Sequence, residues 1–351
     1  MNMRVEKALR YTGRMLRNIL FQEPTLVFAK IHTTFRCNLR CTYCNLPSLR
    51  TPELSTGQWL SVIDQLADLG CRRVTLTGGE SLLRQDLPEL IRGIRERGMS
   101  CLLVSNGVLV SKMIDRLKLL NTLTLSLDAV GSAHDAVRGE GVFEAVKEAI
   151  AAAKGAGIPV KINSVMSVKT APMLDDLLEF VEQNKIYITI GILRSEETDL
   201  WGQAVTIKAE DEEIRRTLKR LANLSWTNKW ILFSETTYRY AALWDDFLKD
   251  RYETGDLPED NPILRAGPRC HAGRNYMTIL PDGMVYPCIM TALRIPGGNV
   301  VTDGVKEAWR QLHQHRCVAC YIPCQVEQNF LFSLKPRVVK NFVKKHLAHF
   351  H

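Results

Sequence analysis

The feature that most constrains this chain is a regular alternation, starting near residue 25, of short β-branched runs with longer amphipathic segments. This pattern is typical of successive βα units, in which each helix returns the chain so that consecutive strands run parallel. Strands are predicted at residues 26–34, 73–77, 100–105, 122–127, 160–165 and 186–193, with helices between them at 56–69, 87–97, 143–155 and 173–184. Six parallel strands with outer helices form either a doubly wound sheet or an incomplete barrel, and periodicity alone does not separate the two.

The composition is that of a globular protein with room for one large α/β domain and a smaller module. The chain has 351 residues, of which 46% are hydrophobic and 24% charged. No stretch reaches the roughly 18 apolar residues of a membrane span, and residues 1–17 lack the apolar core of a signal peptide, so we expect a cytoplasmic protein. Ten cysteines in a reducing compartment indicate metal binding more than disulfides.

The net charge of +8 is concentrated at the two ends of the chain. It permits an anionic substrate, a nucleic acid or an anionic membrane, and nothing else in the sequence favours nucleic acid. We expect a basic helix at residues 1–24 and a basic amphipathic helix at 331–351, whose apolar stripe is Val339, Phe342, Val343, Leu347 and Phe350. Such helices either touch the inner membrane surface peripherally or pack their apolar stripe on the domain.

Three cysteines follow the first predicted strand within eight residues. A loop that carries Cys37, Cys41 and Cys44 can wrap one corner of an iron-sulfur cube, because each thiolate binds one iron. Three ligands leave the fourth iron open to a small chelating molecule. A structural zinc site is the alternative, but it usually needs a fourth ligand, and the nearby sequence supplies none.

The CxxxCxxC spacing, the Asn-Leu-Arg filling and Tyr43 before the last cysteine closely resemble the signature of the radical S-adenosylmethionine superfamily. The resemblance implies a 4Fe-4S cluster whose open iron binds the amino and carboxylate groups of S-adenosylmethionine. It also implies an α/β fold, an incomplete (β/α)6 TIM-like barrel over residues 25–200, with the active residues at the carboxyl ends of the strands.

The resemblance extends to motifs at the ends of the later strands. Gly78 and Gly79 would let the backbone approach the cofactor, and Glu80 would accept its ammonium group, although Ser81 stands where the family commonly has proline. Arg138 would pair with the cofactor carboxylate. The remaining positions expected to contact the cofactor are Tyr43, Ser105, Asn106, Ser126, Asp128, Asn163 and Leu193.

A second group of cysteines lies beyond an expected helical bridge at 201–264. Cys270, Gly283 and Cys288 form a C-x12-G-x4-C element with a hairpin turn at Pro281, and Cys317, Cys320 and Cys324 follow. Spacing alone fits a zinc ribbon as well as an iron-sulfur cluster.

This second group is similar to the C-terminal SPASM and twitch modules of radical enzymes, which hold auxiliary 4Fe-4S clusters. A full SPASM module needs about seven cysteines, so five at 265–330 indicate the shorter, one-cluster type. The expected ligands are Cys270, Cys288, Cys317 and Cys320, with Cys324 as the alternative to Cys320.

The resemblance implies reductive cleavage of S-adenosylmethionine to a 5'-deoxyadenosyl radical that abstracts hydrogen from a substrate carbon, with electrons from a donor such as flavodoxin or ferredoxin. We expect the auxiliary cluster to take part in electron transfer, giving net oxidation or C-C or C-X bond formation. Only about 25 residues precede the barrel, which favours a small-molecule or lipid-linked substrate over a peptide. A ribosomal-peptide maturase and a non-catalytic iron-sulfur or zinc protein are the alternatives.

Overall fold

A parallel sheet at the centre of the molecule follows the chain order of its first six strands. The computed structural model describes residues 23–193 and 210–347, so nearly all of the expected helix at 1–24 and the boundary expected at residue 200 lie outside the described residues. Each of the six strands pairs in parallel with the next. They are β1 (Phe28–His32), β2 (Arg73–Thr77), β3 (Ser100–Ser105), β4 (Thr122–Ser126), β5 (Val160–Met166) and β6 (Tyr187–Ile192). This arrangement confirms the incomplete barrel.

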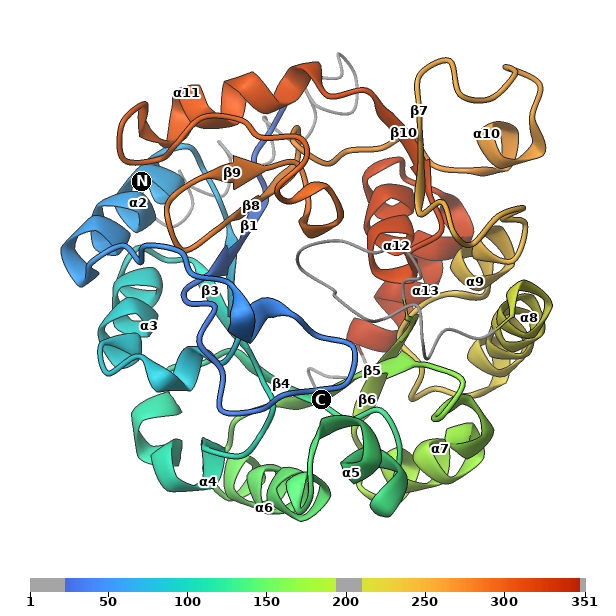
Figure 1. Cartoon of the computed structure of the whole chain (residues 1–351), viewed down its shortest axis with the longest axis horizontal. Helices are drawn as coiled ribbons and strands as arrows, with labels where there is room; N and C mark the ends of the chain where they lie inside the picture. The colour runs from blue at the N-terminus through green and yellow to red at the C-terminus, as the bar shows by residue number, and fades with distance from the viewer. Residues whose placement is uncertain (1–22, 194–209, 348–351) are drawn as a thin grey trace.

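Helices surround these strands on the outside of the barrel (Figure 1). They are α2 (Thr56–Asp68), α3 (Leu87–Glu96), α4 (Val110–Met113), α5 (Ser132–Arg138), α6 (Val142–Gly155) and α7 (Leu174–Gln183). The first begins at a capping box in which Ser55 and Gln58 satisfy each other's main-chain N–H groups. Its Trp59 and Ile63 are fully buried against the sheet, so the apolar face that the sequence predicts holds the helix in place.

The two faces of the strands differ in polarity. On β4, Leu123 and Leu125 are fully buried under the helices, while Thr122, Thr124 and Ser126 alternate with them and remain partly exposed. Because successive strand residues point to opposite faces, the polar residues line the interior of the barrel. The lumen face of β4 is therefore polar and partly accessible.

The C-terminal cysteine region extends the same sheet. β8 (Tyr276–Ile279) pairs in parallel with the free edge of β1, and β9 (Val285–Tyr286) pairs antiparallel with β8. A second small sheet joins β7 (Arg251–Glu253) to β10 (Cys317–Cys320). The segment expected as a helical bridge thus also contains a strand, and that strand pairs with the last cysteine motif.

The rest of the C-terminal half is helical. It comprises α8 (Asp211–Thr227), α9 (Glu235–Ala241), α10 (Pro262–Ala266), α11 (Gly304–Gln311), α12 (Pro323–Phe332) and α13 (Pro336–Leu347). α12 lies on the open side of the barrel, where it contacts β6, and its Asn329 accepts a hydrogen bond from the Tyr276 hydroxyl of β8 at 3.2 Å (Figure 1). This helix therefore fills the gap between the two edges of the sheet.

The final helix differs from the expected amphipathic pattern. Val338 and Lys345 of α13 are buried, and the Lys345 ammonium donates to the carbonyl oxygen of Ser225 at 3.2 Å. Phe342 and Val343, expected in the apolar stripe, are 40% and 44% exposed. These two side chains of the predicted stripe thus remain accessible at the surface. Lys345 lies off the stripe and is buried because the stem of a long lysine side chain can pack in the interior while its ammonium reaches main-chain acceptors. None of the described helices is long and apolar enough to cross a membrane.

Candidate active site

The first cysteine loop follows β1 at the carboxyl end of the barrel. Cys37, Cys41 and Cys44 are all partly exposed, and the main-chain N–H of Cys44 donates to the carbonyl of Cys41 at 3.1 Å. Burial raises the pKa of all three thiols, that of Cys44 to about 11. Metal binding requires the thiolate, so a cluster bound here would displace three protons.

The Gly78-Gly79 turn packs against the chain that leads into this loop. The Gly79 and Glu80 N–H groups donate to the carbonyls of Thr34 and Arg36, each at 2.8 Å. A Cβ on Gly79 would lie 2.3 Å from the Arg36 carbonyl oxygen, and Gly78 has a φ of +147°. These glycines, which are expected to let the backbone approach the cofactor, also permit this close main-chain contact, which a Cβ would prevent.

The Glu80 carboxylate, which is expected to accept the cofactor ammonium, is fully buried. One oxygen accepts from the Ser105 hydroxyl at 3.0 Å and the Asn106 N–H at 2.9 Å, and the other from the Leu82 N–H at 3.1 Å. Burial raises its pKa. These bonds tie the end of β2 to the end of β3, so the geometry favours a positioning role for Glu80.

Asn106 links this network to the cysteine loop. Its side-chain NH₂ donates to the Asn38 side-chain oxygen at 2.8 Å and lies 3.8 Å from the Cys37 sulfur. The structure thus brings Ser105 and Asn106, both predicted from sequence, next to the first cysteine. A hydrogen bond to a ligand sulfur is one of the means by which proteins tune an iron-sulfur cluster.

Tyr43, Asp128 and Arg138 form a buried network on the other side of the loop. The Arg138 guanidinium donates to Asp128 at 2.7 Å and to the Tyr43 hydroxyl at 2.6 Å, and the hydroxyl donates to Asp128 at 3.1 Å. The guanidinium lowers the pKa of Asp128 despite complete burial. Arg138, which is expected to pair with the cofactor carboxylate, is 8% exposed and has Asp128 as a carboxylate partner.

Three further predicted positions lie on or just after β4, β5 and β6. Ser126 and Asn163 are register partners on β4 and β5, both partly exposed on the face that lines the lumen. The Asn163 oxygen accepts from the Thr189 hydroxyl at 3.0 Å. Leu193 is buried in a cluster with Tyr43, and its N–H donates to Met166 at 2.8 Å. Of the three, Ser126 and Asn163 keep polar atoms available to a ligand.

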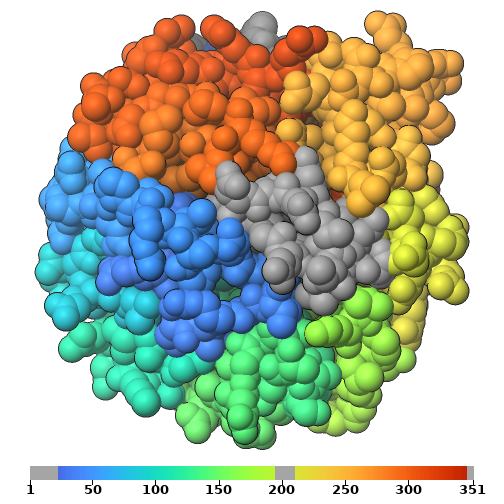
Figure 2. Space-filling model, viewed as in Figure 1, coloured from blue at the N-terminus to red at the C-terminus, as the bar shows by residue number. Residues whose placement is uncertain are grey.

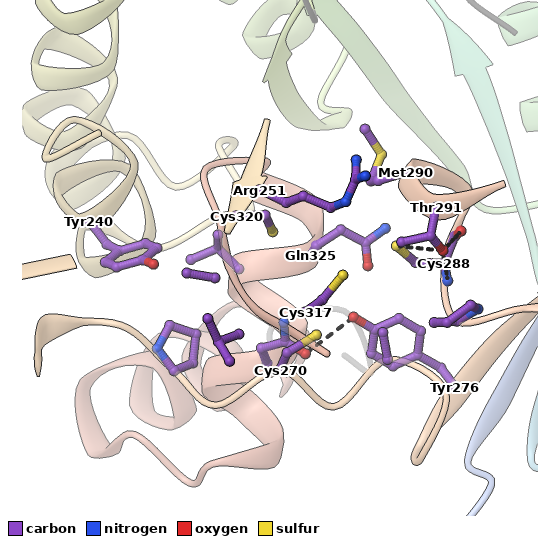
Figure 3. Close-up of a pocket in the computed structure, with 17 residues that line it drawn as sticks. Tyr240, Arg251, Cys270, Tyr276, Cys288, Met290, Thr291, Cys317, Cys320 and Gln325 are labelled. Atoms are coloured by element: carbon purple, nitrogen blue, oxygen red, sulfur yellow. Dashed lines mark hydrogen bonds between the residues drawn. The ribbon is translucent and has the colours of Figure 1, made fainter. Parts of the chain in front are cut away.

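A cavity in the C-terminal region gathers four of the five remaining motif cysteines (Figure 3). Cys270 precedes β8, Cys288 follows β9, and Cys317 and Cys320 stand at the two ends of β10. Cys324, in the first turn of α12, is not among the described residues that line the cavity. The lining therefore favours Cys320 over Cys324 as the fourth ligand, because only Cys320 faces the same space as the other three.

This donor set suits an iron-sulfur cluster. Burial raises the pKa of Cys270 to about 12 and also raises that of Cys288, so bound metal would have to displace their protons. Within the described residues, no group of three or more Cys, His, Asp or Glu side chains is arranged to hold a single metal ion. A cluster spreads four thiolates over four irons and so accepts a wider arrangement.

Sequence reasoning missed the other residues that line this cavity. Tyr276, Arg251, Met290 and Gln325 all face it, and each comes from a different element (Figure 3). The Gln325 side-chain oxygen is buried and has no hydrogen-bond partner among the described residues. No local motif marks these positions, because only tertiary packing brings them beside the cysteines.

The two cysteine regions are in contact. Phe35 and Leu46, which flank the first cysteines, pack with Leu280 and Tyr286 of the hairpin, and the Leu54 N–H donates to the Pro281 carbonyl at 2.9 Å. In the space-filling view the corresponding blue and orange segments lie side by side (Figure 2). The auxiliary cavity is thereby attached to the edge of the barrel.

The geometry defines an iron-sulfur enzyme built on an incomplete barrel, and comparison with known proteins gives its class. Residues 31–183 match the radical SAM superfamily, and residues 270–332 match the SPASM iron-sulfur cluster-binding domain; together they cover more than half of the chain. The protein belongs to the radical SAM superfamily and carries a C-terminal SPASM module. Its cofactors are S-adenosylmethionine and 4Fe-4S clusters.

Several relatives align with this chain. An AdoMet-dependent heme synthase of Nitratidesulfovibrio vulgaris is 27% identical over 305 residues, which span 84% of this chain and 81% of the relative. A PqqA peptide cyclase of Granulibacter bethesdensis is 35% identical, over 42% of this chain and 41% of its own. The structure of Streptococcus suis SuiB bound to S-adenosylmethionine shares the fold with a TM-score of 0.61 at 18% identity, covering 87% of this chain and 68% of SuiB.

Proposed function

We propose that this protein cleaves S-adenosylmethionine reductively and uses the product radical to abstract hydrogen from a substrate carbon. The observation that carries the proposal is a three-cysteine loop held at the carboxyl end of an incomplete barrel, with a four-cysteine cavity attached to the edge of the same sheet. With the first cluster and S-adenosylmethionine bound, the cofactors supply the electron and the 5'-deoxyadenosyl radical.

The protein's own residues position this chemistry. Cys37, Cys41 and Cys44 would hold the first cluster and leave one iron open. The buried Glu80 and the Tyr43 network fix the two sides of the loop, and Ser126 and Asn163 present polar atoms from the lumen toward the cofactor. A rigid loop matters because hydrogen abstraction depends on the distance between the reacting carbons.

We propose Cys270, Cys288, Cys317 and Cys320 as the ligands of an auxiliary 4Fe-4S cluster. Four protein ligands would leave no iron open for substrate, so the cluster would serve electron transfer and make the net reaction an oxidation or a bond formation. What supports this is the cavity that these four cysteines share.

A small-molecule or lipid-linked substrate is the class that we propose. The heme synthase aligns with 84% of this chain and the PqqA peptide cyclase with 42%, which favours a small molecule. A peptide substrate stays as the second candidate, because the cyclase has the higher identity over the part of the chain that it matches. Flavodoxin or ferredoxin would supply the electron.

Peripheral membrane contact rests on α13 alone among the described elements. Lys340 and Lys344 are exposed, and Phe342 and Val343 lie partly exposed between them. A basic face with apolar side chains suits an anionic bilayer. Co-sedimentation with phosphatidylglycerol vesicles, which would lose any binding in Lys340→Glu/Lys344→Glu, tests it.

The proposed reaction is tested by anaerobic incubation of reconstituted, reduced protein with deuterated candidate substrates. We expect 5'-deoxyadenosine to form and to carry deuterium from the true substrate. Absence of 5'-deoxyadenosine in fully loaded protein would instead support a non-catalytic iron-sulfur protein. Transfer from a peptide but from no small molecule would select the second candidate.

A further inference from the structure

A second cleft lies beside the auxiliary cavity and opens to solvent. It has a volume of about 430 Å³ and shares Tyr240, Cys270 and Cys317 with the auxiliary cavity. Two of the four proposed cluster ligands therefore form the wall between the cavity and the cleft. A cluster in the cavity would therefore lie directly behind the wall of this cleft.

The cleft is strongly basic. Arg269, Arg274 and Arg316 line it together with His313 and His315, and no Asp or Glu is among the described lining residues. Arg269 and Arg316 are exposed at its rim. Burial and the nearby Arg274 lower the pKa of both histidines, so the positive charge near neutral pH comes from the arginines.

The nearest acidic residues are shared with cations outside the cleft. Asp256 forms an ion pair with Lys249 at 3.0 Å and also interacts with Arg316, and Glu253 lies 3.9 Å from the Arg251 guanidinium. Three arginines therefore face at most these two shared carboxylates. Arg316 is anchored by a hydrogen bond from its guanidinium to the Thr254 carbonyl at 3.0 Å. The rim arginines thus keep their charge directed to solvent, where it can attract an acidic surface.

We propose that this cleft is the docking surface for an acidic electron-carrier protein of the flavodoxin or ferredoxin type, which takes one electron from the auxiliary cluster. The inference rests on the proposed function, since it needs a cluster held by Cys270 and Cys317. One electron passes from the reduced cluster to the oxidised carrier, and no bond is formed or broken. Charge complementarity of this kind orients a transient redox complex and speeds its formation.

The test is direct binding of oxidised flavodoxin to the reconstituted, full-length holoenzyme by calorimetry at about 50 and 200 mM salt. Arg269→Glu/Arg316→Glu should weaken binding about tenfold or more at low salt and flatten its salt dependence. The matched control is Arg92→Glu/Arg116→Glu, two exposed arginines on α3 and after α4, on the opposite side of the barrel (Figure 1). We expect the control to bind within about twofold of the wild type.

A second readout is the rate at which flavodoxin reoxidises the reduced auxiliary cluster, followed by absorbance in the same variants. Equal loss of binding in both double variants, equal retention in both, or no binding by the wild type would overturn the docking proposal. Iron and sulfide content and 5'-deoxyadenosine are measured on the same preparations. If the iron and sulfide content and 5'-deoxyadenosine formation are normal but flavodoxin does not bind, only the docking proposal is rejected. If the second cluster is missing, the proposed function is rejected before docking is tested.

Discussion

A buried ion pair between Asp128 and Arg138 joins the cysteine loop to the ends of β4 and β5. Asp128 also accepts from the Val165 N–H at 2.9 Å, and the Tyr43 hydroxyl completes the set. Fully buried charges persist only when they are paired and hydrogen-bonded, so each member depends on the others. At the scale of single residues, this network carries the placement of Cys41 and Cys44.

We predict that Asp128→Asn destabilises the protein by about 3–5 kcal/mol, because Arg138 would keep a buried charge without its counter-ion. Urea unfolding measures the effect, and iron content should fall at the first cluster. Asp115→Asn is the matched control, since its ion pair with Lys118 is on the surface, and should leave both readings unchanged. A stable Asp128→Asn protein with full iron would contradict the proposed positioning role.

Lys161 gives a pH-dependent prediction. Burial, together with Arg73, lowers its pKa from 10.5 to about 8, and it has no ion-pair partner among the described residues. The charged form therefore destabilises the folded state by about 3 kcal/mol below pH 8, and this penalty shrinks as pH rises toward the unfolded pKa.

Lys161→Met should accordingly be more stable than the wild type near pH 7, and its advantage should shrink between about pH 8 and 10.5. Denaturant unfolding across this range measures the difference. Lys118→Met, at a side chain that is 60% exposed, serves as the control. A Lys161→Met advantage that did not change with pH would show that packing, not charge, is responsible.

The elements place the site through close main-chain contacts. The turn after β2 packs its two glycines on residues 34–36, and the cysteine loop begins at the next residue. On the other side of the barrel, Glu327 of α12 accepts from the Ser234 hydroxyl at 2.7 Å, which fixes this helix between the sheet edges. The position of the first cluster thus depends on the turn after β2, and that of the auxiliary cavity depends on α12.

We expect Gly79→Ala to cost about 1–3 kcal/mol and to lower the iron content of the first cluster, because its Cβ would collide with the carbonyls of Phe35 and Arg36. Thermal unfolding and iron analysis test this. Gly57→Ala is the control, since a Cβ there meets nothing within 4 Å and alanine is the better helix former. If Gly79→Ala kept the stability and iron content of the wild type, the turn would be able to shift from residues 35 and 36 without affecting the first cluster.

At the scale of the whole molecule, two iron-sulfur sites share one sheet. β1 leads into the first cysteine loop and pairs with β8, which leads into the auxiliary hairpin. Loss of one cluster should therefore leave the other in place, because each has its own ligands.

We predict about eight irons per wild-type chain and about four in the triple Cys37, Cys41 and Cys44→Ala variant. Cys320→Ser should also lose about four, whereas Cys324→Ser should keep all eight, because Cys324 does not line the cavity. Iron and sulfide analysis decides between these outcomes. If Cys324→Ser loses iron and Cys320→Ser does not, Cys324 rather than Cys320 is the fourth ligand.

Much of this protein could be predicted from sequence because its signals are local. The six strands follow from β-branched runs, and the observed bounds lie within one residue of those predicted, except at the ends of β1, where they differ by two. The first cysteine motif marks an iron-sulfur site for the same reason, since short spacers let one loop surround a corner of a cluster. The second group indicates such a site only through its resemblance to the SPASM and twitch modules.

Contacts between distant residues were decided only by the tertiary structure. Glu80 and Arg138, which are expected to meet the cofactor, are each buried with partners on other elements, and no spacing reveals these partners. The pairing of β8 with β1, the cavity that selects Cys320 over Cys324, and the basic cleft beside it likewise join segments more than 40 residues apart. The sequence by itself determined the class of chemistry, because the spacing of the cysteine ligands is set along the covalent chain. The partners of each buried charge, in contrast, depend on how the elements pack.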